Sequence, residues 1–338
     1  MHRIDLKNYE IRTDLAIEAS INIDNINKSV KRIDDIIVTN IYLDSNSSKI
    51  VNKKSGNYTT IEFDDVTDFN KKEKVKEIFS KELKIFLEKL NIQLDASCLV
   101  LGLGNISSTP DALGPLSLNN ILVTNHLFEI SKVEEGFRRV SAFSPGVTGN
   151  TGIETSDLVL GVISKLKPDF VIVIDALASK SLDRVNKTIQ MTDTGIHPGS
   201  GIGNNRKEIS KGTLGIPVIA IGIPTVVDAV TIVSDTITYM QKHFSYMKNN
   251  IKSVNKLIPI NKINYLNASV EIKLEDKKNL LGMVGSLDDI EIRQLIYEVL
   301  SPIGYNLMVT PKEINFVIDK LSDIIGSGIN KALHEKCD

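Results

Sequence analysis

The chain of 338 residues lacks several signatures that would assign a function directly. It has only two cysteines, Cys98 and Cys337, and neither a Cys-x-x-Cys pair nor a His-Glu-x-x-His motif, so the common zinc patterns are missing. A Gly-x-Ser-x-Gly motif is also missing, which removes the commonest serine hydrolase pattern. Cys98 lies in an apolar run, and we expect it to be a small core residue and not a nucleophile.

Charge of one sign and long apolar runs are lacking as well. The net charge of -2 gives no reason to expect nucleic-acid binding or a basic patch for a membrane surface. No apolar stretch approaches the roughly 20 residues that span a bilayer, and Met1–Glu10 carries no apolar signal core. We therefore expect a cytoplasmic protein with no nucleic-acid partner and no membrane partner.

From residue 98 onward, apolar strand-like runs alternate with helical patterns. This order predicts an α/β fold, a three-layer α/β/α arrangement around a mainly parallel sheet. An amphipathic helix is expected over 71–90, and a last helix is expected to begin at Thr310-Pro-Lys-Glu313, with Thr310 as its cap, and to run to about His334. The expected strands are 98–104, 121–127, 169–179, a short one at 188–190, and 217–223, and a helix is expected from Val226 towards His243.

Two further regions stand apart from this pattern. Residues 35–43 and 58–63 read as an antiparallel pair of strands, which predicts a small β attachment near 35–64. Residues 246–296 are polar and rich in Lys and Asn, which predicts a surface insertion.

Two carboxylates follow strand-like runs. In Asp169–Ser179, DFVIVIDALAS, an apolar run ends abruptly on a carboxylate, Asp175, which we place at the carboxyl end of a central strand. Asp111 lies in the loop after the run 98–104. The structural alternatives are a turn acid after Pro110 and a helix cap at Asp175. If the two acids converge, they can share a proton, and one can activate water while the other donates to the carbonyl oxygen or leaving amine, which is peptide or amide hydrolysis.

The glycine-rich loops and the histidines are less specific. The turn Gly102-Leu-Gly104-Asn105 lacks the third glycine of a dinucleotide fingerprint, because Ser107 stands there. Loops at Gly146–Gly152 and Gly201–Gly203 could hold an anion through backbone N–H groups, but neither continues into Lys-Ser/Thr. His126 and His197 lie near expected strand ends, where structural and ligand roles both remain open.

Several stretches resemble the germination protease (spore protease) family of endospore-forming bacteria. The most specific is Asp193–Lys207, DTGIHPGSGIGNNRK, and the resemblance covers almost the whole chain, least at 44–56 and 246–296. The other matching stretches are Leu101–Asn105, Thr109–Pro115, Phe143–Glu154, Val171–Ser179, Pro217–Asp228 and Leu307–Ile314.

The resemblance implies an endopeptidase of atypical aspartic type, with no cofactor and no metal, which degrades small acid-soluble spore proteins that coat DNA in dormant spores. It implies a core fold similar to that of hydrogenase maturation proteases, a homotetramer, and a location in the forespore and spore core. By the same resemblance, Asp111 and Asp175 match the two acids implicated in catalysis, and Glu154, Asp193 and His197 are further candidates for shaping the site.

The resemblance also implies a zymogen that processes itself. Cleavage sites of the family have an acid, a large apolar residue, Ala and a further acid, and Arg12–Ala19, RTDLAIEA, fits this pattern at the bond Asp14–Leu15. Residues 1–14 are then a pro-segment and 15–338 a single α/β peptidase domain. A flexible terminus is cleavable, and a substrate-like segment can block a cleft.

Two other readings stay open. One is a metal-assisted endopeptidase of the maturation type, with Asp111, Asp175 and His197 as ligands. The other is a non-enzymatic α/β protein whose glycine-rich loops bind an anion.

Overall fold

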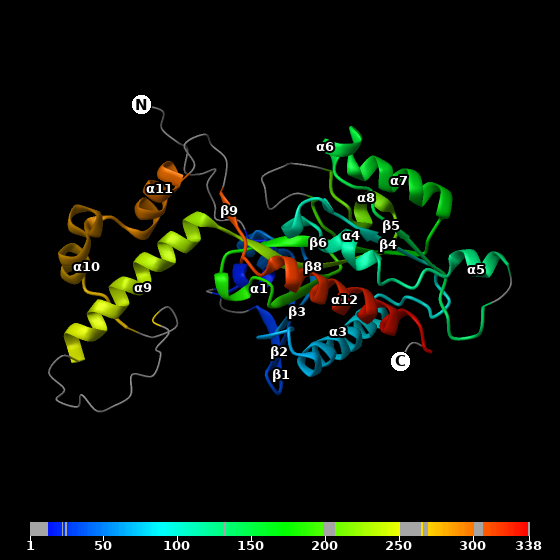
Figure 1. Ribbon diagram of the computed structural model, residues 1–338, viewed down its shortest axis with the longest axis horizontal. Helices are drawn as coiled ribbons and strands as arrows, with labels where there is room; N and C mark the ends of the chain where they lie inside the picture. Colours follow the sequence, from blue (N-terminus) through cyan, green and yellow to red (C-terminus); the bar gives the residue numbers. More distant parts are fainter. Residues whose placement is uncertain are drawn as a thin grey trace. The chain divides into compact units, whose positions relative to one another are not determined.

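The chain forms two compact units. The computed structural model describes residues 13–21, 23, 26–130, 133–198, 207–250, 265, 270–300 and 307–336. The larger unit comprises Arg12–Val226 and Thr310–Asp338, and the smaller unit comprises Met1–Ile11 and Val227–Val309 (Figure 1). Residues 246–296 fall in the smaller unit, and no helix among the described residues is long and apolar enough to cross a membrane.

Within the described residues, nine strands join in one sheet, in the order β1-β2-β3-β7-β8-β6-β4-β5, with β9 paired to the end of β8. Pairing is parallel between β4 and its neighbours β5 and β6, and antiparallel from β8 through β7, β3 and β2 to β1. The strands are β1 (Asn27–Ile33), β2 (Ile36–Leu43), β3 (Gly56–Glu62), β4 (Cys98–Gly102), β5 (Val140–Phe143), β6 (Phe170–Ser179), β7 (Thr188–Thr192), β8 (Val218–Asp228) and β9 (Met308–Val309).

The expected α/β fold is confirmed, and so is the antiparallel pair. The predicted strands 35–43 and 58–63 are β2 and β3. They extend the main sheet, because β3 pairs with β7, where Thr59 lies opposite Met191.

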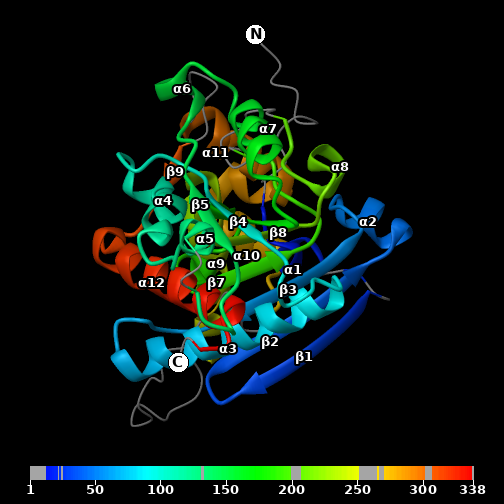
Figure 2. The ribbon, with the colours of Figure 1, turned by 90° about the vertical axis from the view of Figure 1, so that its right-hand side faces the viewer.

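One face of the sheet, here called the first face, is apolar and covered by helices. Alternate residues of β6, Phe170, Ile172 and Ile174, belong to a core cluster that also takes in residues of α3 (Phe69–Lys89), α4 (Leu113–Leu118) and α12 (Ile314–Leu333). Helices α3 and α12 lie side by side over this face (Figure 2). The side chain of Asp68 accepts a hydrogen bond from Lys71 N and caps α3, which confirms the helix expected over 71–90.

The opposite face, here called the second face, has two kinds of cover. Val171 and Val173 pack with Val159 of α7 (Thr155–Leu166) in a second cluster. Further along β6, Leu177 packs with residues of the N-terminal segment Thr13–Ser20, which includes α1 (Ala16–Ala19). Because side chains alternate along a strand, Val171, Val173, Asp175 and Leu177 share this face.

Three sequence predictions are wrong in detail. Residues 121–127 do not form a strand: Leu122 N donates to Asn330 Oδ1, Thr124 N donates to Val140 O, and helix α5 (Asn125–Glu129) follows. The last helix begins at Ile314, because the Thr310 hydroxyl donates to Thr225 O and does not cap a helix. Strand β8 continues to Asp228, so the next helix begins at Ala229 and not near Val226.

The smaller unit is built around α9 (Ala229–Asn250) and α11 (Asp289–Leu300). Val230, Ile292 and Ile296 form its core cluster, and β9 pairs with the last residues of β8. The remaining short helices among the described residues are α2 (Ser45–Val51), η2 (Thr109–Asp111), α6 (Thr148–Thr151), η3 (Leu182–Arg184), α8 (Lys211–Leu214), α10 (Leu274–Leu281) and η5 (Gly282–Ser286).

Candidate active site on the second face of the sheet

The N-terminal segment Thr13–Ser20 is built into the larger unit. Leu15 and Ala16 are 0% exposed and pack with Ile41, Leu43 and Leu177. The segment that matches the cleavage pattern therefore lies on the sheet as part of a core, on the same face as Asp175.

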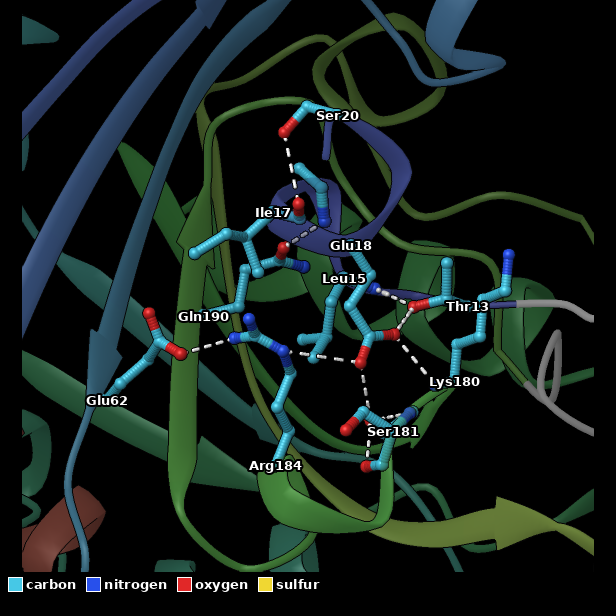
Figure 3. A network of polar contacts seen from close by, with 12 residues as sticks. Thr13, Leu15, Ile17, Glu18, Ser20, Glu62, Lys180, Ser181, Arg184 and Gln190 are labelled. Carbon is cyan, nitrogen blue, oxygen red and sulfur yellow. Dashed lines mark hydrogen bonds and ion pairs between the residues drawn. The ribbon is translucent and has the colours of Figure 1, made fainter. Parts of the chain in front are cut away.

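Glu18 anchors this segment through a buried polar network. Its carboxylate accepts hydrogen bonds from Ser179 Oγ at 2.8 Å and from Lys180 N at 2.7 Å, and lies 3.4 Å from Arg184 Nε (Figure 3). Arg184 also pairs with Glu62 of β3, and the Thr13 hydroxyl donates to Glu18. Both oxygens of this buried carboxylate therefore accept hydrogen bonds, and these contacts hold the segment against the end of β6.

The backbone around Asp14 is held from three sides. Asp14 N donates to Ala178 O at 3.0 Å, while Ala178 N donates to Asp14 Oδ2 at 2.8 Å. Gln190 of β7 donates from Nε2 to Asp14 O at 3.0 Å and accepts at Oε1 from Ala16 N at 2.7 Å. Lys53 Nζ donates to Thr13 O at 2.6 Å. The bond Asp14–Leu15 is thus fixed between β6 and β7.

The pKa of Lys53 is lowered by burial, although the nearby carboxylates of Asp14 and Glu18 act in the opposite direction. A lysine in this position is easier to deprotonate than an exposed lysine. The buried position from which Lys53 donates to Thr13 O therefore destabilises the charged form of its side chain.

Asp175 is 6% exposed and lies within β6, four residues before the strand ends at Ser179. The expectation that it ends a strand, or caps a helix, is wrong, because the apolar run is followed by further paired residues and not by a turn. Its Oδ1 accepts a hydrogen bond from Ala176 N at 2.9 Å. Burying an ionised carboxylate inside a strand costs free energy unless the carboxylate has polar partners. Buried acids of this kind are typical of functional sites.

Asp111 ends the short helix η2, which contacts β6. Its Oδ2 accepts from Asn105 N at 2.8 Å, and its neighbour Pro110 accepts from the Thr225 hydroxyl of β8 at 2.6 Å. Gly104 has a φ of +109°, and a Cβ there would lie 2.0 Å from Asp111 O, so only glycine permits this approach.

The loop that carries Asp111 is tied to the strand that carries Asp175. Leu103 N donates to Ile174 O at 2.8 Å, next to Asp175 along β6. Both predicted acids therefore stand on neighbouring elements of one region of the sheet. The catalytic role of either acid stays a prediction at this point.

The other predicted site residues lie in different surroundings. Asp193 accepts from Asn57 N at 2.8 Å and from Asn57 Nδ2 at 2.7 Å, which fixes the loop after β7 to the start of β3. The His197 side chain is 51% exposed and lies 3.8 Å from Glu208, which also pairs with Lys54. Glu154 precedes α7, and its Oε1 is buried without a hydrogen-bond partner among the described residues.

The pKa of Glu208 reflects two opposing effects. Burial acts to raise it, but hydrogen bonds from Lys54 and Ser210 outweigh burial, and the pKa is lowered. Glu208 is therefore the anionic partner that His197 and Lys54 face. His126 lies in α5, and residues 199–206 of the long motif and 1–12 of the expected pro-segment are outside the described residues.

A cavity of about 380 Å³ opens on the second face beside Asp14. The strand residues Leu177 of β6, Gln190 and Thr192 of β7, and Gly222 of β8 line it. The rest of the lining consists of Asn52, Lys53, Lys54, Tyr58, Thr194, Gly195, Ile196, His197, Ala220 and Ile221. Two regions that the sequence alone left unconnected, the cleavage-like segment and the loop of His197, therefore line one cavity.

Gln190 is a polar residue of this site that the sequence analysis did not single out. A signal for Gln190 was present: in Thr188–Thr192, TIQMT, its neighbours Ile189 and Met191 belong to the apolar cluster, so Gln190 lies on the opposite face. Among the described residues, no group of three or more His, Cys, Asp or Glu side chains could hold a metal ion.

Comparison with known proteins gives a consistent family. Residues 5–338 match the model of a peptidase family described as germination protease. Germination proteases of Geobacillus sp. (strain WCH70) and Bacillus thuringiensis subsp. konkukian are 50% and 51% identical to this chain, covering 99% of it and 96% of each relative.

Among solved structures, a NiFe hydrogenase maturation protease from Thermococcus kodakarensis matches 38% of this chain and 74% of its own. The match has 20% identity and a TM-score of 0.26.

Proposed function

The chain belongs to the germination protease family, a family of peptidases, and from this premise we propose that Asp111 and Asp175 form the catalytic acid pair of an endopeptidase that first processes itself. In this proposal one carboxylate activates a water molecule and the other protonates the leaving amine. The observation that carries it is the binding of the cleavage-like segment Thr13–Ser20 to the same sheet face as Asp175.

The bond we propose for self-processing is Asp14–Leu15. Two observations support this choice. The Asp14 side chain is bound by Ala178 N, as an acid at a recognised position would be, and Leu15 fills an apolar pocket. Glu18 provides the second acid of the pattern and is bound by Ser179, Lys180 N and Arg184. Cleavage would detach residues 1–14 as a pro-segment.

The proposed substrates after processing are small acid-soluble spore proteins, which carry the same pattern of acid, large apolar residue, Ala and acid. This function places the enzyme in the forespore and spore core. Membership in a peptidase family favours this function over a protein that only binds anions.

We also propose that the enzyme is a homotetramer, which the family resemblance implies. Exposed apolar residues on α9 support self-association: Met240, Phe244 and Met247 follow helical spacing and are 43%, 49% and 44% exposed. Sedimentation velocity of the wild type and of Phe244→Glu tests this, since a monomeric wild type would contradict it.

The experiment for the acid pair measures the intact mass and the N-terminal sequence of the purified chain during incubation at mildly acidic pH. We expect a new terminus at Leu15 in the wild type. In Asp111→Asn and Asp175→Asn the rate should fall on the order of 10²–10⁴-fold, with the fold retained by circular dichroism.

The matched control is Asp169→Asn, an acid-to-amide change just before the same strand. Asp169 binds Ser97 N and Ser97 Oγ, away from the segment. It should process as the wild type does. Wild-type processing by the Asp111 and Asp175 variants would refute the proposed acid pair.

A further inference from the structure

The side chain of Gln190 forms hydrogen bonds with the backbone on both sides of the bond Asp14–Leu15. Its Nε2 lies 3.0 Å from Asp14 O, and its Oε1 lies 2.7 Å from Ala16 N. Asp14 O is the carbonyl oxygen of the bond proposed for self-processing. Gln190 is 5% exposed, so both contacts are made out of bulk water.

The orientation of this amide is set by its backbone partner. Because Ala16 N can only donate, it must face Oε1, and this leaves the two N–H groups of Nε2 directed to the Asp14 side. Two further contacts fix the same stretch: Asp14 pairs with Ala178, and Lys53 holds Thr13 O. The donor and the carbonyl are therefore placed before any reaction begins.

Hydrolysis of this bond moves negative charge onto Asp14 O. A water molecule gives a proton to the carboxylate that acts as base, its oxygen bonds to the Asp14 carbonyl carbon, and the π electrons of the C=O bond move to the carbonyl oxygen. The C–N bond to Leu15 then breaks as the other acid of the pair gives a proton to the Leu15 nitrogen, and the carbonyl re-forms as the α-carboxyl group of Asp14. A fixed N–H donor at this oxygen binds the anionic intermediate more strongly than the neutral carbonyl.

We propose that Gln190 is a catalytic residue of self-processing, which stabilises the oxyanion that forms on Asp14 O. The inference rests on the proposed cleavage at Asp14–Leu15. Gln190 neither gains nor loses a proton in this step, so it supplements the acid pair and does not replace either carboxylate.

The test compares the first-order rate of appearance of the Leu15 terminus in wild type and Gln190→Met, which has a side chain of similar length without donor or acceptor. Loss of an oxyanion donor is expected to slow processing on the order of 10²–10³-fold. The matched control is Thr188→Val, the preceding position on the same face of β7, whose buried hydroxyl has no hydrogen-bond partner among the described residues and which does not line the cavity. It should process at a rate close to wild type.

Gln190 also holds the segment in place, so a second readout separates the two roles. Hydrogen exchange of the amides of residues 17–20 is measured in the Asp175→Asn background, where the chain stays intact. Continued protection with slow processing supports the catalytic role. Loss of protection in Gln190→Met would show that the segment has left the sheet, and this result would overturn the catalytic role. Processing of Gln190→Met at the wild-type rate would also overturn it.

If Gln190→Met does not fold, Gln190→Glu keeps the acceptor for Ala16 N and replaces the amide donor by oxygen. Wild-type processing by this variant would overturn the inference, and slow processing would support it. Absence of a Leu15 terminus in the wild type itself would overturn both the processing proposal and this inference. Normal wild-type processing with unaffected Gln190 variants would overturn the inference alone.

Discussion

The two faces of the sheet are built from the same strands but hold different chemistry. On the first face β6 contributes Phe170, Ile172 and Ile174, which pack with helices α3 and α12. On the second face the same strand contributes Val171 and Val173 and then changes to Asp175, Leu177 and Ser179. Strand β7 repeats the contrast, with Ile189 and Met191 on one side and Gln190 on the other.

This contrast shows how a fixed scaffold can carry a polar site. The first face is sealed by long helices, so each residue there serves burial. The second face is covered at one end by α7 and at the other by a short segment held through backbone and carboxylate hydrogen bonds. A bond in the segment Thr13–Ser20 can therefore be cleaved while the apolar core on the first face stays intact.

The largest expected difference between the two faces comes from a pair of substitutions on β6. Ile172→Ala should lower the free energy of unfolding by about 4 kcal/mol, because it leaves a cavity in the first face. Asp175→Asn should leave stability nearly unchanged and slow processing on the order of 10²–10⁴-fold. Urea unfolding and N-terminal sequencing of both variants check this, and equal losses of stability would contradict a division of labour between the faces.

A second change tests how firmly the N-terminal segment is held. Glu18→Ala leaves Arg184 without one of its carboxylate partners and Lys180 N without its acceptor, and it removes one of the two acceptors of Ser179 Oγ. Breaking a buried network of this kind should cost about 3 kcal/mol. Chemical denaturation gives the free energy, and the exposed Glu129→Ala on α5 is the control; equal small losses would mean that the network contributes little.

A third change tests the packing of Gly222, which lines the cavity. A Cβ at Gly222 would lie 2.5 Å from Leu177 Cγ, so Gly222→Val must push Leu177 towards the N-terminal segment. Overpacking should cost about 2 kcal/mol. Thermal unfolding measures this, and Gly212→Val, whose Cβ would meet only Ser210 Oγ at 3.6 Å, serves as comparison.

The smallest expected effect concerns Lys53 and depends on pH. Burial lowers the pKa of Lys53 in the folded chain, so the unfolded chain binds more protons between that lowered value and the usual value of about 10.4. The contribution of Lys53 to stability therefore rises as pH increases through this window and is lost as pH falls through the folded pKa.

Lys53→Met should flatten the rise. Urea midpoints measured from pH 8 to pH 10.5 check this, with the exposed Lys49→Met as control. An identical pH profile in Lys53→Met and wild type would contradict it.

Local pattern was enough for most of the scaffold. The run in Asp169–Ser179 predicted β6 and the amphipathic pattern predicted α3, because burial on a strand or a helix imposes a short sequence period. Local pattern predicted a strand at 121–127, where a few apolar residues instead lead into α5. It also predicted a helix cap at Thr310, whose hydroxyl instead donates to Thr225 O of β8.

The sequence by itself determined which residues carry carboxylates, and its apolar runs predicted the strands that precede Asp111 and carry Asp175. Only the tertiary structure decided that Asp175 lies inside a strand, that Thr13–Ser20 packs into the sheet, and that Gln190 holds the backbone of Asp14 and Ala16, residues more than 170 positions away in the chain. The reason is physical: a periodic pattern records whether a residue is buried, whereas a hydrogen bond between distant segments depends on register and direction that no local pattern contains.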